Sequence, residues 1–309
     1  MITSLFRKST VLNYSIVIIG VVIFFFLYQI QSFTDQNSAL EFFKKGIVFC
    51  TILASVFTVN FIIKKNGLSK DSAYTALFYF ILLLFFPSLW NNFALAVSNF
   101  FILLALRRLI SLQSIKFTKE KLFDASLWIF VASLFHFWSI LYILLVFITI
   151  LFHAARDYRN WILPIIAFFT TTSIFVSLSL FFNKSWIENV ISQSVVDYKI
   201  NYFVNNYQNL ALSIYATVAL FFLVSMFMSI SNRPVILHSS FKKIIWTFII
   251  GIAIFIISPN KSNDLLIFTI APLAMMATSH IEMAQIKWQK EVVISFLIIA
   301  GFFAFFSQL

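Results

Sequence analysis

Few side chains of this protein could do chemistry, and the first group lies between two apolar stretches near the N-terminus. Asp35 and Glu41 follow the apolar run from Val11 to Ile30, and Lys44 and Lys45 directly precede the next run. A carboxylate at the point where a membrane span emerges is placed to act as a general base, and a lysine beside it can hold an anionic group. We therefore predict Asp35 and Glu41 as catalytic residues and Lys44 and Lys45 as substrate-binding residues.

A second group of charged residues stands in the long segment from Asn183 to Asn209. Asp197 and Lys199 are predicted there as further substrate-binding residues. Apolar side chains recur in this segment at steps of three or four, at Ile187, Ile191, Val195, Tyr198 and Tyr202. This spacing predicts an amphipathic helix over about residues 185–207 that lies in the membrane interface. Such a helix either covers the bundle or forms a wall or lid over an outward-facing cavity.

The remaining reactive residue types form no pattern for a metal or nucleotide site. The four histidines, His136, His153, His238 and His280, are at least 17 residues apart and lack a carboxylate at metal-motif spacing. Cys50 is the single cysteine and lies in an apolar run. The whole chain has five glycines, and a phosphate-binding loop needs several of them close together, so we do not expect such a loop. We predict no metal and no cofactor.

The composition predicts a membrane protein. The chain has 309 residues, of which 61% are hydrophobic and 11% charged, and its mean hydropathy is +0.96. Soluble domains have roughly 45–50% apolar and about 25% charged residues. Stretches such as Ile16 to Leu27 are apolar on every face, which excludes the alternating strands of a β-barrel. The predicted fold is an all-α polytopic helical bundle that forms a single integral membrane domain over residues 1–309.

Apolar windows of roughly 20 residues, which cross about 30 Å of hydrocarbon, locate the spans. Clear spans are Val11–Ile30, Gly46–Ile63, Ser72–Pro87, Phe93–Leu106, Trp161–Phe182, Leu210–Ile230, Ile244–Ile257, Leu265–Thr278 and Val292–Phe306. The segment from Leu122 to His153 is too long for one span and is interrupted at Phe135 to Ser139, so we predict a hairpin of two short helices there. The total is about nine to eleven membrane segments.

The distribution of positive charge predicts the orientation, because lysine and arginine accumulate in short cytoplasmic loops. With the N-terminus inside, all but five of the 22 lysines and arginines lie on the cytoplasmic side. The five exceptions are Lys44, Lys45, Lys184, Lys199 and Lys261. We predict a multi-pass protein of the bacterial inner membrane with a cytoplasmic N-terminus. The cations are spread over six loops without an aromatic-interleaved basic stripe, so we predict no nucleic-acid partner.

Polar residues inside the spans are mostly uncharged. Asn60, Ser98, Asn99 and the run from Thr170 to Ser173 are the principal ones, and such residues commonly form hydrogen bonds between helices. The centres of the spans are nearly free of ionisable groups, which argues against an ion-coupled pump. A carrier for an uncharged solute or a lipid would not need them.

The segment from Asp35 to Gly46 resembles the first outer loop of the C-type membrane glycosyltransferases, in which an acidic residue is followed by a short helix that ends near a glycine. The stretch from Asn92 to Arg108, the interrupted hairpin and the Arg156 to Arg159 turn are also similar to the middle of those enzymes. The resemblance covers the first half of the chain and implies a polyprenyl-phosphate-linked substrate. This chain departs from the pattern at Gln36, and at Ser98 and Asn99, where the family often carries further acids. A degenerate, non-catalytic relative fits equally well.

The whole chain resembles a set of phenylalanine-rich, multi-spanning bacterial inner-membrane proteins of similar length that are classified only as a domain of unknown function. Its 42 phenylalanines are typical of that set. This resemblance implies no activity.

Three functions follow from these observations. The first is an outward-facing transferase in which Asp35 deprotonates an acceptor hydroxyl, Glu41 or Asp197 assists, and a lysine such as Lys44 holds the phosphate of a polyprenyl-phosphate carrier. The second is a non-catalytic membrane subunit that positions a membrane or envelope protein partner. The third is a carrier for a lipid or a neutral solute. Membrane lipids are expected partners in every case.

Overall fold

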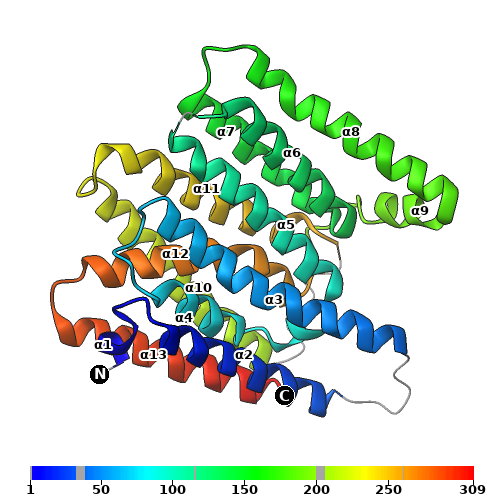
Figure 1. The fold of residues 1–309 in the computed structure, drawn as a ribbon. Helices are drawn as coiled ribbons and strands as arrows, with labels where there is room; N and C mark the ends of the chain where they lie inside the picture. The colour runs from blue at the N-terminus through cyan, green and yellow to red at the C-terminus, as the bar shows by residue number, and fades with distance from the viewer. Residues whose placement is uncertain (1, 33–38, 115, 200–205, 260) are drawn as a thin grey trace.

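The computed structural model of the protein describes residues 2–32, 39–114, 116–199, 206–259 and 261–309, and within them every regular element is a helix (Figure 1). The longer helices are α2 (Val11–Gln31), α3 (Ala39–Lys65), α5 (Phe93–Ile110), α6 (Thr118–Phe135), α8 (Arg159–Phe182), α10 (Asn206–Ile230), α11 (Val235–Ile257), α12 (Ile267–Met283) and α13 (Lys287–Ser307). The shorter ones are α1 (Ile2–Phe6), α4 (Tyr74–Leu83), α7 (Ile143–His153), α9 (Ser185–Ser192), and the 3₁₀ helices η1 (Pro87–Asn91), η2 (Ser111–Ser114), η3 (Phe137–Tyr142) and η4 (Asn263–Leu266).

The prediction of an all-α polytopic bundle is confirmed. In the described residues, eight helical segments are long and apolar enough to cross a membrane. They comprise α2, α3, α5 with η2, α8, α10, α11, η4 with α12, and α13. The helices α4, α6 and α7 occupy the other three predicted positions. The order of the elements along the chain is therefore the predicted one.

The hairpin predicted between Leu122 and His153 is also confirmed. Helix α6 ends at Phe135, His136 adopts an extended backbone conformation, and the 3₁₀ helix η3 leads into α7. The backbone N–H and the hydroxyl of Ser139 both donate to the carbonyl of His136, at 3.1 and 2.7 Å, and so hold the turn at the break.

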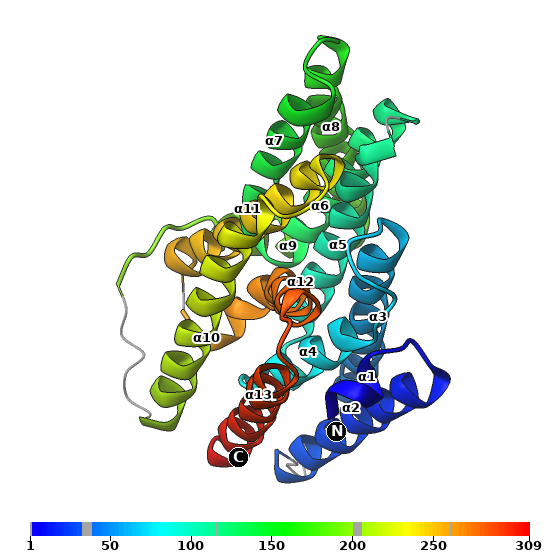
Figure 2. The same ribbon diagram turned by 90° about the vertical axis from the view of Figure 1, so that its left-hand side faces the viewer.

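The centre of the bundle is formed by α4 and α12, which pack against each other (Figures 1 and 2). All ten residues of α4 are buried. In the segment Asn263–Met283, which contains α12, 94% of an apolar stretch of 18 residues is buried. The prediction that the helix between Ser72 and Pro87 is long enough to span the membrane is therefore wrong. This helix, α4, has ten residues and is about 15 Å long at 1.5 Å per residue, half the thickness of a bilayer core. It can end inside the bundle because protein, not lipid, surrounds its ends.

Two glycines bring helices into close contact with this centre. A Cβ atom on Gly301 of α13 would lie 3.1 Å from the carbonyl oxygen of Ile81 in α4, and one on Gly251 of α11 would lie 2.8 Å from the Cγ2 atom of Thr269 in α12. The larger apolar side chains fill the rest of the core. Phe24 of α2, for example, packs edge-on against the buried Phe305 of α13 with ring centroids 4.8 Å apart.

The helix connections fall into two sets at the two ends of the bundle. We call one the basic end; it comprises α1 and the connections α3–α4, α5–α6, α7–α8, α10–α11 and α12–α13, and it lies to the left in Figure 1 and faces the viewer in Figure 2. The opposite end comprises η1, η3, α9, the α11–α12 connection and the end of α13. Cations that the sequence assigns to the cytoplasmic side thus gather at the basic end.

Candidate binding sites at the two ends of the bundle

The first group of predicted site residues lies at the start of α3, at the opposite end. Asp35 lies outside the described residues. Glu41 and Lys44 are exposed and Lys45 is half-buried, all on the first two turns of α3. The expectation of a separate short helix that ends near Gly46 is wrong, because α3 continues through that glycine without interruption. A glycine inside a helix costs only about 1 kcal/mol, and the apolar residues that follow hold the helix in the bundle.

The second group is held against the α11–α12 connection, also at the opposite end. The N–H of Asp197 donates to the carbonyl of Ile257 at 3.2 Å, and Lys261 Nζ donates to the carbonyl of Asp197. The carboxylate of Asp197 accepts the backbone N–H of Lys199 at 2.8 Å. This carboxylate therefore shapes its own turn. In the described part of the chain no hydrogen bond or ion pair joins Lys44 to Asp197 or Lys199.

The amphipathic helix predicted over about residues 185–207 is shorter than expected. Helix α9 ends at Ser192, Gln193–Lys199 are not helical, and 200–205 lie outside the described residues. The hydroxyls of Ser192 and Ser194 donate to backbone carbonyls three residues earlier, at 2.9 and 2.6 Å. Such local bonds compete with helix continuation. The indole of Trp138 then donates to the carbonyl of Val195 at 3.3 Å, which fixes the extended segment on η3.

Two buried side chains at the opposite end were not predicted as site residues. Asp264 in η4 is 7% exposed, and it accepts a hydrogen bond from the hydroxyl of Ser88. His136 Nε2 lies 3.1 Å from the hydroxyl of Ser258, and its ring packs on Phe268. Both side chains join separate segments of the chain, which accounts for their burial.

Polar residues within the spans were predicted to bond between helices, and this is confirmed for three of them. Asn60 Nδ2 donates to the hydroxyl of Tyr14 at 2.9 Å, and Asn99 Nδ2 to that of Tyr79 at 3.1 Å. Ser98 donates to the carbonyl of Ala132 at 3.1 Å, from α5 to α6. Thr170 and Thr171 differ, because both donate to the carbonyl of Ala167 in their own helix.

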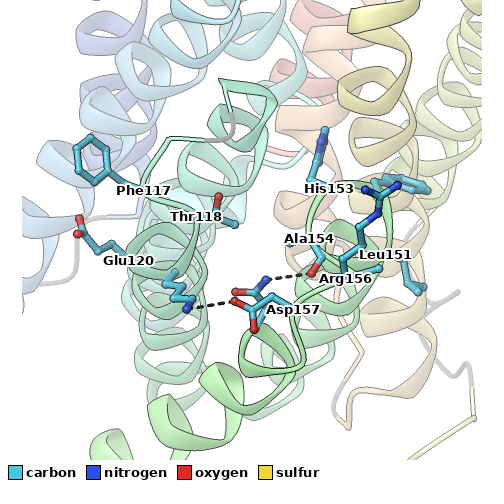
Figure 3. A pocket seen from close by; sticks show the side chains of 12 residues that line it. Phe117, Thr118, Glu120, Leu151, His153, Ala154, Arg156 and Asp157 are labelled. Carbon is cyan, nitrogen blue, oxygen red and sulfur yellow. Dashed lines mark hydrogen bonds and ion pairs between the residues drawn. The ribbon is translucent and has the colours of Figure 1, made fainter.

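Two open hollows lined by described residues lie at the basic end. The first has a volume of about 780 Å³ and lies between the start of α6 and the end of α7 (Figure 3). His153 and Arg156 stand on one wall, and Phe117 and Glu120 on the other. Its charges are mixed, since Lys119 Nζ forms an ion pair with Asp157 at 3.1 Å.

The pKa of the Asp157 carboxyl is lowered from its ordinary value. The backbone N–H of Arg159 donates to this carboxylate at 3.0 Å, and Lys119 adds a positive charge beside it. Both interactions favour the ionised form. Asp157 therefore carries a negative charge at neutral pH and neutralises part of the cationic wall of the first hollow.

The second hollow, which we call the basic hollow, has a volume of about 550 Å³ and joins the ends of α3 and α5 to the start of α6. Its charged lining residues are Lys65, Arg107, Arg108, Lys116 and Lys121. None of the described residues that line it is acidic. Electrostatically, the basic hollow is suited to an anion.

Phe117 lies between the two hollows and lines both. Its backbone is left-handed, with φ 56° and ψ 42°, and its side chain is 70% exposed. The left-handed conformation costs a residue with a side chain roughly 1–2 kcal/mol, and strain of this kind concentrates at binding sites. The sequence gives no sign of this conformation.

Lys243 lies behind the hollows and is fully buried, although the sequence places it in a basic loop. Its Nζ donates to the carbonyl of Leu109 at 2.7 Å and lies 3.3 Å from His153 Nε2. Because α11 begins at Val235, Lys243 falls within the helix and points inward, whereas its neighbour Lys242 is exposed. This lysine joins α11 to α5 and α7.

The chain was compared with protein-family models, curated proteins and solved structures. The model of a family of unknown function, DUF6427, matches residues 1–309. The chain belongs to this family. The comparisons with curated proteins and with solved structures gave no match.

Membership of DUF6427 confirms the predicted relationship to a family without a known activity. Together with eight helices that are long and apolar enough to cross a bilayer, it fits a multi-pass membrane protein. The family description names no reaction, so the resemblance to C-type glycosyltransferases stays a prediction.

Proposed function

We propose that this DUF6427 protein is a non-catalytic membrane subunit that positions a protein partner in the bacterial inner membrane, with its N-terminus in the cytoplasm. The observation that carries this proposal is the outward face of α8. Only 17% of an apolar stretch of 18 residues in α8 is buried inside the bundle, because α8 packs chiefly on α6 at the edge of the bundle (Figure 1).

The outward face of α8 carries small hydroxyl residues among large apolar ones. Thr172, Ser173 and Ser177 are exposed, and Ser173 and Ser177 are four residues apart on one face of the helix. Small residues at this spacing let a second helix approach closely, and their hydroxyls form hydrogen bonds between helices in lipid. Lipid tails offer these hydroxyls no acceptor, so a partner helix is the better match for this face.

The interior of the bundle supports the same proposal, because its polar groups join helices to one another. The hydroxyl of Tyr142 donates to the carbonyls of Thr247 and Phe268 at 3.2 and 3.1 Å, and Tyr215 and Thr269 share a hydrogen bond of 2.7 Å. These bonds fix η3, α10, α11 and α12 relative to each other. A rigid frame of this kind suits a subunit that holds another protein in place.

The test is isolation of the protein from native membranes in mild detergent. We expect a stoichiometric protein partner that is lost from the double variant Ser173→Leu/Ser177→Leu. The matched control is Ser213→Leu/Thr217→Leu on α10, where the two exposed hydroxyls already donate to carbonyls of their own helix at 2.9 and 2.8 Å. Recovery of the wild-type protein alone from native membranes would contradict the proposal.

A transferase acting on a polyprenyl-phosphate-linked substrate is the second candidate. It is favoured by the placement of Glu41, Lys44, Lys45, Asp197 and Lys199 at the same end of the bundle. In this candidate Asp35 is the general base, and its replacement by asparagine should lower activity by about 10²- to 10⁴-fold. A co-purifying polyprenyl phosphate without a protein partner would favour the transferase over the subunit.

A further inference from the structure

The cations of the basic hollow come together from separate segments of the chain. Lys65 is the last residue of α3, and Arg107 and Arg108 lie in the last turn of α5. Lys116 precedes α6, and Lys121 lies in its first turn. Charges that only set the orientation of a membrane protein need no common site, because the rule concerns their number in each loop. Their convergence on one hollow is an additional property.

Two of these cations are bound to neighbouring groups of the protein. Arg108 forms an ion pair with Asp124 at 2.9 Å, and Lys121 Nζ donates to the carbonyl of Ser111 at 2.8 Å and to the hydroxyl of Ser114 at 2.9 Å. These contacts fix the walls of the hollow. Arg107, Lys65 and Lys116 then remain to face a ligand.

An aromatic ring places two of the three remaining cations. The guanidinium of Arg107 lies 4.9 Å from the centroid of the Phe61 ring, and Lys65 Nζ lies 5.2 Å from the same ring. Phe61 and Phe57, one helical turn earlier, are 41% and 42% exposed on the outward face of α3. An apolar surface that could accept an acyl chain therefore adjoins the cationic hollow.

We propose that the basic hollow binds the phosphate of an anionic lipid headgroup, while an acyl chain of the same lipid lies along Phe57 and Phe61. Arg107, Lys65 and Lys116 would contact the phosphate, and the exposed ring of Phe117 would close the other side. A soluble phosphate compound would use the charges and leave the apolar surface without a role. This proposal goes beyond the subunit function and does not depend on it.

The experiment compares lipid retention by native mass spectrometry after purification in detergent with equal amounts of phosphatidylglycerol and phosphatidylcholine. The wild-type protein should retain phosphatidylglycerol preferentially. The double variant Arg107→Gln/Lys116→Gln should lower this preference by at least about tenfold, since each cation near a lipid surface contributes about 1 kcal/mol.

The matched control is Lys287→Gln/Lys290→Gln, which removes the same charge from α13 at the same end of the bundle. It should keep the preference within about twofold, and the charge-conserving Arg107→Lys/Lys116→Arg should also retain it. An equal loss in the control would overturn the proposal, because bulk charge would then explain the binding. Displacement of the lipid by millimolar inorganic phosphate would overturn the assignment to a lipid.

If the test variant fails to fold, wild-type protein in 1 M salt provides the second measurement. Screening at this concentration acts over about 3 Å and should abolish the preference for phosphatidylglycerol. A preference that survives high salt would contradict a site built from these cations.

Discussion

The two ends of the bundle hold their helices together with different groups. At the basic end, ion pairs join Lys64 to Asp71, Arg108 to Asp124 and Lys119 to Asp157, and these are the ion pairs found among the described residues. At the opposite end, amide side chains donate to backbone carbonyls. Gln308, for example, bonds to the carbonyl of Phe85 at 3.0 Å. The ion pairs of the basic end should therefore respond to salt, whereas the bonds between amides and carbonyls at the opposite end should not.

The central helix α12 shows the same difference along its own length. At the basic end, Glu282 in its last turn accepts hydrogen bonds from the backbone N–H of Lys70 and the hydroxyl of Ser72. A carboxylate at a helix C-terminus opposes the helix dipole, so these bonds must compensate for its position. At the opposite end, Asp264 precedes the helix, where the dipole favours negative charge.

The largest effect is expected at Glu282. The variant Glu282→Ala leaves the N–H of Lys70 and the hydroxyl of Ser72 without their acceptor, and it should lower the free energy of unfolding by about 2–4 kcal/mol. The measurement is unfolding in mixed micelles. The control Glu282→Gln keeps an acceptor oxygen and should lose less. Equal losses in both variants would show that charge, and not hydrogen bonding, holds this end of α12.

A smaller effect is expected at Gln308. Its Nε2 donates to the carbonyls of Phe85 and Ala304 at 3.0 and 2.7 Å, and Gln308→Ala should lower the free energy of unfolding by about 1 kcal/mol. Because no ionised group takes part, the loss should be the same at low salt and at 1 M salt. A loss that changes with salt would remove the distinction between the two ends.

The smallest effect is expected for the exposed pair of Lys119 and Asp157. The pKa of Asp157 lies below its ordinary value of 3.8, so its contribution to stability is present above that pH and is lost as pH falls through the lowered pKa. The midpoint of thermal unfolding of Asp157→Asn should therefore fall below that of the wild type at pH 7 and low salt. The difference should vanish at 1 M salt and at a pH below the lowered pKa of Asp157. Lys119→Met should behave in the same way at pH 7.

The order and class of the elements could be predicted from the sequence, because apolar runs and basic loops are local properties. The break at Phe135 to Ser139 was found in this way. The short length and the enclosure of α4 were not predicted, since an apolar residue such as Phe78 has the same hydropathy whether lipid or protein surrounds it. Hydropathy cannot distinguish a span from a helix enclosed by others.

The candidate sites were less predictable than the fold. The basic hollow depends on three segments meeting in space, and Lys65, Arg107 and Lys116 each have an ordinary position at the end of a span. Lys243 differs from Lys242 only by its direction on one helix. The predicted role of Asp197 in substrate binding stays a prediction. The sequence did not indicate that its carboxylate accepts a hydrogen bond from the backbone N–H of Lys199.

The enclosure of α12 has a consequence for synthesis in the cell. The chain emerges from its N-terminus, so α2 to α11 can enter the membrane before α12 exists, and the surface of α4 that α12 covers must meanwhile face lipid or water. The segment that contains α12 is the least apolar of the eight long ones. Its stable residence in the bilayer therefore depends on a space that the earlier helices have already formed. Assembly of this protein is completed late, when one of its last helices closes the centre.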